Sequence, residues 1–468
     1  MELISKTACE VLDLLNQDEV TPLDLLDQLE KRIGDVDDKV NALPTLCFDR
    51  ARKNAKALMD KPQDQRGELA GIPVAIKDLT EVEGVLSTHG SPIYKDNISV
   101  ASDHIAERVE NSGGVIYAKS NTPEFGAGGN TFNEVFGATV NPWDTRMSAA
   151  GSSGGSAVAL ATGMAWLAHG SDMGGSLRNP ASFCGIVGMR PSPGRVPCGP
   201  SYNPYDNLGM EGPMARNVED LALLLDAMSH WEYREPQSLE KPAVSFLDQV
   251  RNREKPMRVA FSADLGITPV DPEVAAICRK AADQLQDSGV DVIEAHPDFT
   301  EAHESFQILR AVSFCTGIGG LLETNRSELK PEVIWNLEKG FNLKAEDVIK
   351  AFKQRNQLVT RSYEFMQNYD MLLTPATIVS PYTIDQRYVT SCNGVEFDTY
   401  IDWLAIAYAI TLVSLPALSL PCGFTSTGLP VGLQMVGKPR GEGGLLAGAK
   451  HMEDVLGLPL QPIDPRVK

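Results

Sequence analysis

Several sequence features that would assign a function are missing from the chain. Its eight cysteines are scattered, with no CxxC pair, so neither a zinc site nor a disulfide framework is indicated. No uncharged apolar run reaches the ~18 residues that a membrane helix needs, and prolines interrupt the nearest one, residues 403–424. We therefore expect a cytoplasmic protein with no metal and no membrane span.

Positive charge is also scarce. Lysine and arginine number 42 against 62 aspartates and glutamates, which gives a net charge of −20. No local basic cluster offsets this balance, and an acidic surface repels both nucleic acid and anionic membranes. The sequence therefore predicts a small-molecule partner, and it leaves a homodimer open.

Two nucleotide-binding motifs are missing as well, and a Ser-His-Asp hydrolase is not indicated. Residues 151–155, GSSGG, have the spacing GxSxG, but no histidine lies in that cluster. There is no GxGxxG, and neither glycine-rich cluster carries the lysine of a phosphate-binding loop. His169 is the one histidine beside a serine cluster, and we interpret it as structural. No cofactor is predicted.

The sequence does contain two dense clusters of small residues. The first is GSSGGS at 151–156, and the second is HGSDMGGSLRNP at 169–180. Taken alone, such clusters are compatible with a turn, a phosphate cradle or a catalytic loop. Catalysis without histidine needs another base, and a neutral lysine serves that role in Ser-Lys sites. Lys77 follows the apolar stretch GIPVAI, where burial would lower its pKa, although a solvated lysine at a strand end is the simpler interpretation.

Strand and helix patterns alternate along the chain, which favours an α/β fold. Short apolar runs predict strands at 71–76 and 115–119, with a helix between them at 101–112. Thr21, Pro22 and Asp24 predict a helix start, with Gly34 ending that helix. Further helices are expected over residues 217–230, 272–288, 300–369 and 443–456, and strands over residues 257–262, 290–295, 370–376, 415–421 and 429–437.

Three long stretches together resemble the amidase signature family: GIPVAIKDL, GSSGGSAVALATG and GSDMGGSLRNPASFCGIVGMRPS. Weaker similarity covers most of the remaining chain, and residues 231–400 fit least well. The resemblance implies hydrolysis of amide C–N bonds by a Lys–cis-Ser–Ser triad, without a cofactor. It also implies a large, mixed, twisted central sheet covered by helices on both faces. We expect residues 1–468 to form one domain, with a helical N-terminal part at 1–65 and a helix-rich, pocket-forming insertion at 231–370.

The resemblance also assigns roles by motif position. Lys77 is the base, Ser152 the proton relay and Ser176 the nucleophile. Met173, Gly174 and Gly175 precede Ser176 and would supply oxyanion donors, and Gly126 falls where relatives contact substrate. The supporting residues implied are Ser153, Asp172 and Arg178.

Two other functions stay open at this point. The glutaminase subunit of the tRNA-dependent amidotransferase carries an aspartate about eleven residues before its LPA-type strand. That count leads here to Leu404, and Asp402 lies two residues away. A non-catalytic binding protein on the same fold is the other alternative. For an amidase, we expect small aliphatic or aryl carboxamides as substrates, and esters as side substrates. Tyr202, Tyr205, Tyr400 and Trp403 are candidate pocket residues, each also compatible with core packing.

Overall fold

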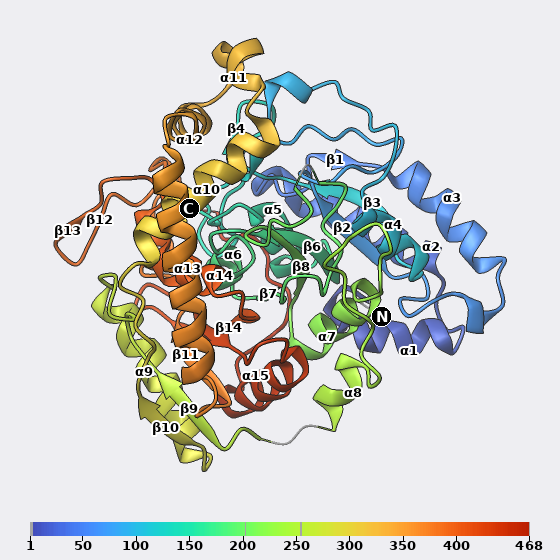
Figure 1. Cartoon of the computed structure of the whole chain (residues 1–468). Helices are drawn as coiled ribbons and strands as arrows, with labels where there is room; N and C mark the ends of the chain where they lie inside the picture. The colour runs from blue at the N-terminus through green and yellow to red at the C-terminus, as the bar shows by residue number, and fades with distance from the viewer. Residues whose placement is uncertain (1–2, 202, 253–254, 468) are drawn as a thin grey trace.

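The computed structural model describes residues 3–201, 203–252 and 255–467. An eleven-stranded sheet crosses the molecule in the order β1-β3-β2-β6-β8-β7-β14-β15-β11-β9-β10 (Figure 1). The strands of this sheet are β1 (Thr45–Leu46), β2 (Pro73–Lys77), β3 (Val115–Ser120), β6 (Leu167–Asp172), β7 (Val187–Arg190), β8 (Met210–Ala215), β9 (Arg258–Phe261), β10 (Asp291–Glu294), β11 (Met371–Pro375), β14 (Ala417–Phe424) and β15 (Pro430–Val436).

The sheet is mixed. Strands β2, β3 and β6 run parallel, and so do β9, β10 and β11, whereas the strands between these two groups pair antiparallel. Two short hairpins lie outside the sheet, β4 (Phe132–Asn133) with β5 (Gly137–Ala138), and β12 (Ser391–Cys392) with β13 (Val395–Glu396). The central strands are buried along almost their whole length, as expected for a sheet covered on both faces.

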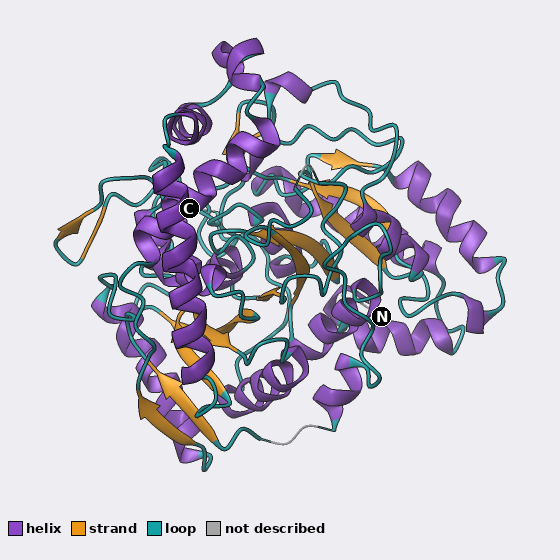
Figure 2. Ribbon diagram, in the orientation of Figure 1, coloured by secondary structure: helices purple, strands orange, loops and turns teal. Residues whose placement is uncertain are grey.

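Helices cover the sheet, as Figure 2 shows, so the expected α/β class with a large mixed sheet is confirmed. The α-helices are α1 (Ala8–Asn16), α2 (Pro22–Val36), α3 (Phe48–Met59), α4 (His104–Asn111), α5 (Gly154–Ala161), α6 (Arg178–Cys184), α7 (Val218–Met228), α8 (Phe246–Arg251), α9 (Pro272–Asp287), α10 (Ala302–Ile318), α11 (Leu321–Thr324), α12 (Pro331–Phe341), α13 (Ala345–Phe365), α14 (Ala405–Leu412) and α15 (Glu442–Leu456).

Local sequence signals explain several of these boundaries. Helix α2 begins with a capping box between Thr21 and Asp24, and Pro22 occupies its first position, as predicted. The predicted stop at Gly34 is wrong by two residues, because this glycine lies inside the helix, which continues to Val36. A glycine ends a helix when it takes a left-handed conformation, and Gly34 does not.

The two small-residue clusters lie at the centre of the molecule. Every residue of helix α5, which follows the first cluster, is buried, and so is every residue of α6, which follows the second. A serine or glycine cluster with this burial is not a surface linker. Bulky residues are excluded there by close backbone contacts. A Cβ on Gly155 would approach the backbone nitrogen of Asn121 to 2.3 Å.

Candidate active site

Lys77 is the last residue of strand β2, and its side chain is completely buried. Its Nζ lies 2.7 Å from the Ser152 hydroxyl and 3.0 Å from the Ser171 hydroxyl, and 3.4 Å from the Ser171 carbonyl oxygen. The described residues place no carboxylate within ion-pair distance of it. Lys77 is therefore held by neutral oxygens alone.

This environment changes the charge state of Lys77. Burial lowers the pKa of its ammonium group from 10.5 to about 7, and the nearby charges of Glu211 and Asp172 oppose the change only in part. An ordinary lysine is almost fully protonated at neutral pH, whereas this one is neutral in a large fraction of molecules. The end of this strand is thus buried, and the alternative of a solvated lysine is wrong.

A second buried lysine shows the contrast. Lys119 lies on the neighbouring strand β3, paired in register with Ile76, and it is also completely buried. Its Nζ donates to the Asp78 carboxylate at 2.9 Å. Lys119 therefore has the counter-charge that Lys77 lacks, and of the two only Lys77 contacts a cavity serine.

Ser152 precedes helix α5, and its peptide bond with Gly151 is cis, as the family resemblance implies. Gly126 lies directly beside it. A Cβ at Gly126 would come 3.4 Å from the Ser152 hydroxyl and 2.9 Å from Leu79, and Gly126 has a φ of +67°, which favours glycine. The structure thus brings Gly126, Lys77 and Ser152 together, although Gly126 is 49 positions from Lys77 in the chain.

Ser176 and Ser152 line the same cavity, whose volume is about 170 Å³. The described residues show no hydrogen bond between their two hydroxyls. Catalytic hydrogen bonds are commonly long before substrate binds. The observation that both serine side chains line one cavity is therefore the one that bears on a shared role. Leucine, isoleucine and phenylalanine side chains also line this cavity: Leu79, Phe125, Phe306, Phe314, Ile401 and Leu404.

Asp172 fixes the backbone that leads into Ser176. Its carboxylate accepts from the backbone N–H groups of Gly175 and Leu177 at 3.0 Å, and from the Arg178 guanidinium at 2.8 and 3.0 Å. Burial alone would raise the pKa of Asp172, but Arg178 and Arg190 lower it to about 2. Asp172 and Arg178 therefore hold this loop through charge-assisted hydrogen bonds.

The candidate oxyanion donors are not equivalent. The Gly175 N–H already donates to Asp172, whereas no described residue accepts from the N–H groups of Gly174 and Ser176. Met173 and Gly174 line the cavity, and Gly175 is absent from its wall. A φ of +108° at Gly175, with Asn179 and Ala407 close to any Cβ there, makes Gly175 a turn-forming residue.

Replacing Asp172 by Asn tests this anchoring. Two buried guanidinium groups would lose their nearby carboxylate, so we expect the free energy of unfolding to fall by about 3–5 kcal/mol. Amide hydrolysis should fall with it, since the Ser176 loop loses its fixed position. Urea denaturation measures the first effect. A variant with wild-type stability would contradict the assigned role.

Ser171 is a contact residue that motif reasoning missed. Its hydroxyl accepts a hydrogen bond from the Lys77 Nζ. Its backbone N–H and carbonyl oxygen both lie 3.3 Å from the Ser153 hydroxyl. Ser153 thus supports the lysine through Ser171, without contacting the lysine itself. The sequence feature that could have indicated Ser171 is its position inside HGSDMGGS, two residues after His169 on strand β6.

His169 takes no part in the serine constellation. It is completely buried in β6, with Nδ1 receiving the Lys77 backbone N–H at 3.4 Å and Nε2 lying 2.7 Å from Glu211. Both ring nitrogens are therefore occupied by structural partners. The interpretation of His169 as structural agrees with these contacts.

The aromatic pocket candidates lie elsewhere. Tyr205 is exposed, while Tyr400 and Trp403 are buried in the core, and none of the three lines the cavity; Tyr202 lies outside the described residues. Sequence reasoning missed Phe125, Phe306 and Phe314, which do line it. It also missed Arg310, a buried cavity residue whose guanidinium donates to Tyr400 at 2.7 Å and to Asn336.

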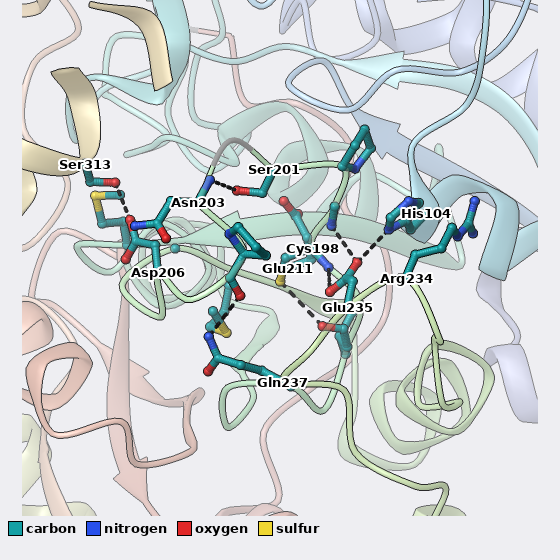
Figure 3. Close-up of a pocket in the computed structure, with 18 residues that line it drawn as sticks. His104, Cys198, Ser201, Asn203, Asp206, Glu211, Arg234, Glu235, Gln237 and Ser313 are labelled. Atoms are coloured by element: carbon teal, nitrogen blue, oxygen red, sulfur yellow. Dashed lines mark hydrogen bonds and ion pairs between the residues drawn. The ribbon is translucent and has the colours of Figure 1, made fainter. Parts of the chain in front are cut away.

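A second cavity of about 520 Å³ adjoins the first, because Met173, Gly209, Met210 and Glu211 line both. Its wall is polar and apolar in about equal measure. In Figure 3 Glu235 faces His104, at 2.7 Å, and Asp206 faces Ser313, at 2.5 Å. The Ser176 cavity thus adjoins a larger chamber of mixed polarity, where the part of a substrate beyond the reacting bond could be accommodated.

Neither metal ligation nor a membrane span is found in the part of the chain that the structure describes. No group of three or more histidine, cysteine, aspartate or glutamate side chains there has the geometry to hold a metal ion. Likewise, no helix among these residues is both long enough and apolar enough to cross a bilayer.

Comparison with known proteins agrees with this geometry. The amidase family model matches residues 24–446. The chain belongs to the amidase family. It is therefore an enzyme that hydrolyses amide bonds. It is 33% identical over 456 residues to an acylamidase of Rhodococcus erythropolis, covering 96% of this chain and 95% of that protein. It is equally identical, over 481 residues and 97% of each chain, to one of the subunits of the glutamyl-tRNA(Gln) amidotransferase of Moorella thermoacetica.

Solved structures show the same fold. A bacterial aryl acylamidase of the amidase signature enzymes superposes with a TM-score of 0.90 at 24% identity, over 96% of each chain. A 6-aminohexanoate cyclic dimer hydrolase gives a TM-score of 0.88 at 26% identity, over 97% of this chain and 98% of that one.

Proposed function

We propose that this amidase cleaves carboxamides through an acyl-enzyme on Ser176, with Ser152 as relay and Lys77 as base. The observation that carries the proposal is the 2.7 Å contact between the Lys77 Nζ and the Ser152 hydroxyl at the edge of the cavity that Ser176 lines. The lowered pKa of Lys77, to about 7, supports it, since a protonated lysine could not accept a proton.

Ser171 orients the amine group of the neutral Lys77. A neutral amine has two N–H groups and one lone pair. If the N–H groups donate to the Ser171 hydroxyl and carbonyl, the lone pair is directed at the Ser152 hydroxyl proton. Ser152 then accepts the proton of Ser176 as its own moves to Lys77.

The reaction balances over two steps. The Ser176 oxygen attacks the carbonyl carbon, and the C–N bond breaks as the proton on Lys77 returns through Ser152 to the leaving nitrogen. Water then attacks the acyl-enzyme, passes a proton along the same relay, and releases the carboxylic acid as the proton returns to Ser176. The N–H groups of Gly174 and Ser176, which have no acceptor among the described residues, would stabilise the oxyanion in each step.

The proposal predicts a specific pH dependence. Lys77 must be neutral, so kcat/KM should rise about tenfold per pH unit below neutrality and level off above the pKa of about 7. Initial rates with an amide that carries no ionisable group measure this directly. A profile that stays flat for about two units on either side of neutrality would contradict the role of Lys77 as base.

The cavity wall supports an apolar acyl group of modest size. Its 170 Å³ and its phenylalanine, leucine and isoleucine side chains fit small aliphatic or aryl carboxamides, and esters of the same acids. Ammonia release from a panel of such amides, with glutamine included, tests this substrate class. The best substrate should be an uncharged amide. A preference for glutamine over every simple amide would overturn it.

The glutaminase alternative is disfavoured by the residue at the expected aspartate position. Leu404 lines the cavity there, and it cannot bind an ammonium group. Asp402 is turned away into contacts with Gln307, at 2.9 Å, and with the Thr399 backbone N–H, at 2.8 Å. Among the described residues, the carboxylates that line the cavity are Asp172 and Glu211, and neither comes from this segment.

We also propose that the helix-rich segment 231–370 shapes this pocket within a single domain of 468 residues. Phe306, Arg310 and Phe314 all come from helix α10 of that segment, and they line the same cavity as the serines. The same segment supplies β9 and β10 to the main sheet, so its packing is continuous with the rest of the molecule.

A further inference from the structure

A separate cavity of about 780 Å³ lies beside helix α13. Five residues of that helix recur on one helical face and line it, at positions 352, 355, 356, 359 and 363. The other walls come from three distant segments, at residues 192–193, 207 and 236–239, and from Ser414 and Arg440. None of these residues lines the Ser176 cavity, so the two sites are distinct.

The charge of this cavity is opposite to that of the chain. The protein carries 62 acidic residues, but no aspartate or glutamate that the structure describes lines this cavity, whereas Arg355 and Arg440 both do. In the described part of the chain, neither arginine forms an ion pair. The charge of Asp206 acts on Arg355, but from beyond ion-pair distance. Two arginines on one cavity without an ion-pair partner indicate a site for an external anion.

Hydrogen bonds fix the Arg355 guanidinium in place at the cavity. Its Nε donates to the Leu412 carbonyl at 2.9 Å, and its Nη2 donates to the Asn207 side chain at 2.5 Å and to Ser414 at 3.3 Å. No acceptor among the described residues is recorded for Nη1. The guanidinium is thus fixed on one side and retains donors on the other, which reduces the entropy lost on binding.

Tyr363 lines the same cavity as the two arginines. Burial raises the pKa of the Tyr363 hydroxyl, and the positive charges of Arg440 and Arg355 oppose that rise. The rest of the lining is partly apolar. Phe352 is 55% exposed at the cavity, and Leu239 and Val359 accompany it. A bare inorganic ion would leave this apolar surface uncovered.

We propose that this cavity binds a small organic anion, a carboxylate or phosphate attached to an apolar group, between Arg355 and Arg440. The oxyanion would accept hydrogen bonds from the two guanidinium groups and the Tyr363 hydroxyl. Its apolar part would cover Phe352, Val359 and Leu239. The inference is independent of the proposed catalytic residues.

Calorimetric titration of the Ser176→Ala protein tests the site without turnover. The probes are benzoate, phenyl phosphate, inorganic phosphate and benzyl alcohol. Benzoate or phenyl phosphate should bind at least about tenfold more tightly than benzyl alcohol, which has the ring but no charge. Inorganic phosphate should bind more weakly than phenyl phosphate. The relative affinity of benzoate and phenyl phosphate tells which headgroup the site prefers.

Variants assign the binding to this cavity. Arg440 is exposed and forms no hydrogen bond or ion pair with the described residues, so Arg440→Gln should fold normally. It should weaken anion binding about three- to tenfold, while Arg440→Lys should retain most of it. Lys353→Gln is the matched control, since Lys353 is exposed on the same helix but does not line the cavity. Equal affinity of the Arg440→Gln and wild-type proteins, equal effects of Arg440→Gln and Lys353→Gln, or no binding of any anion at millimolar concentration would overturn the proposal.

Discussion

Replacing Ser176 by Ala is expected to lower kcat/KM for amide hydrolysis by at least about 10⁴-fold. The substitution removes the only atom proposed to form the acyl-enzyme, so no relay can compensate for it. Ser176 lies in a backbone turn held by Asp172, and the hydroxyl itself has no recorded hydrogen bond among the described residues. The free energy of unfolding should therefore change by less than about 1 kcal/mol. Steady-state kinetics and urea denaturation measure the two effects.

Ser327→Ala is the matched control for this variant. Ser327 is an exposed serine outside the Ser176 cavity, so its loss should leave kcat/KM and stability unchanged. A Ser176→Ala protein that retained more than about a tenth of the wild-type rate would contradict the assignment of the nucleophile.

Replacing Lys77 by Met is expected to remove activity and stabilise the protein at the same time. The relay loses its proton acceptor, so kcat/KM should fall by at least about 10³-fold. The stability effect has the opposite sign. Moving the pKa from 10.5 to about 7 costs at most about 4–5 kcal/mol of folding free energy, at 1.36 kcal/mol per unit. This penalty is absent above pH 10.5, grows as the pH falls, and is complete below about 7.

Methionine removes that penalty but leaves Ser152 and Ser171 without their lysine contacts. We therefore expect a net gain in the free energy of unfolding of about 1–3 kcal/mol near neutral pH. Lys119→Met is the control, because it leaves the buried Asp78 carboxylate without its ion-pair partner. That variant should be destabilised by about 3–5 kcal/mol. A loss of stability in Lys77→Met as large as in Lys119→Met would contradict the account of Lys77 as an unpaired buried amine.

Much of the fold is predictable from local patterns in this sequence. The apolar runs before Lys77 and at 115–119 became β2 and β3, and the C-terminal runs became the antiparallel pair β14 and β15. Helix α15 begins one residue before its predicted start. These elements are set by burial and by local capping. The order of strands in the sheet depends on contacts far apart in sequence, which periodicity does not encode.

The candidate site is likewise predictable from the sequence only in part. Lys77, Ser152 and Ser176 lie in long motifs, so the family resemblance predicts them together, and the structure places Lys77 against Ser152 and both serines on one cavity. Phe306 and Arg310 lie on α10, in the part of the chain that resembles the family least. No short motif marks a pocket wall, because many apolar side chains fill such a wall equally well.

Labelling with a fluorophosphonate, followed by peptide mass spectrometry, tests the central claim most directly. The account predicts one modified residue, Ser176, with loss of amidase activity in proportion to labelling. It also predicts that the Lys77→Met protein labels far more slowly, since nothing then activates the serine. Label on Ser152 or on another serine, or undiminished amide hydrolysis by protein fully labelled at Ser176, would contradict it.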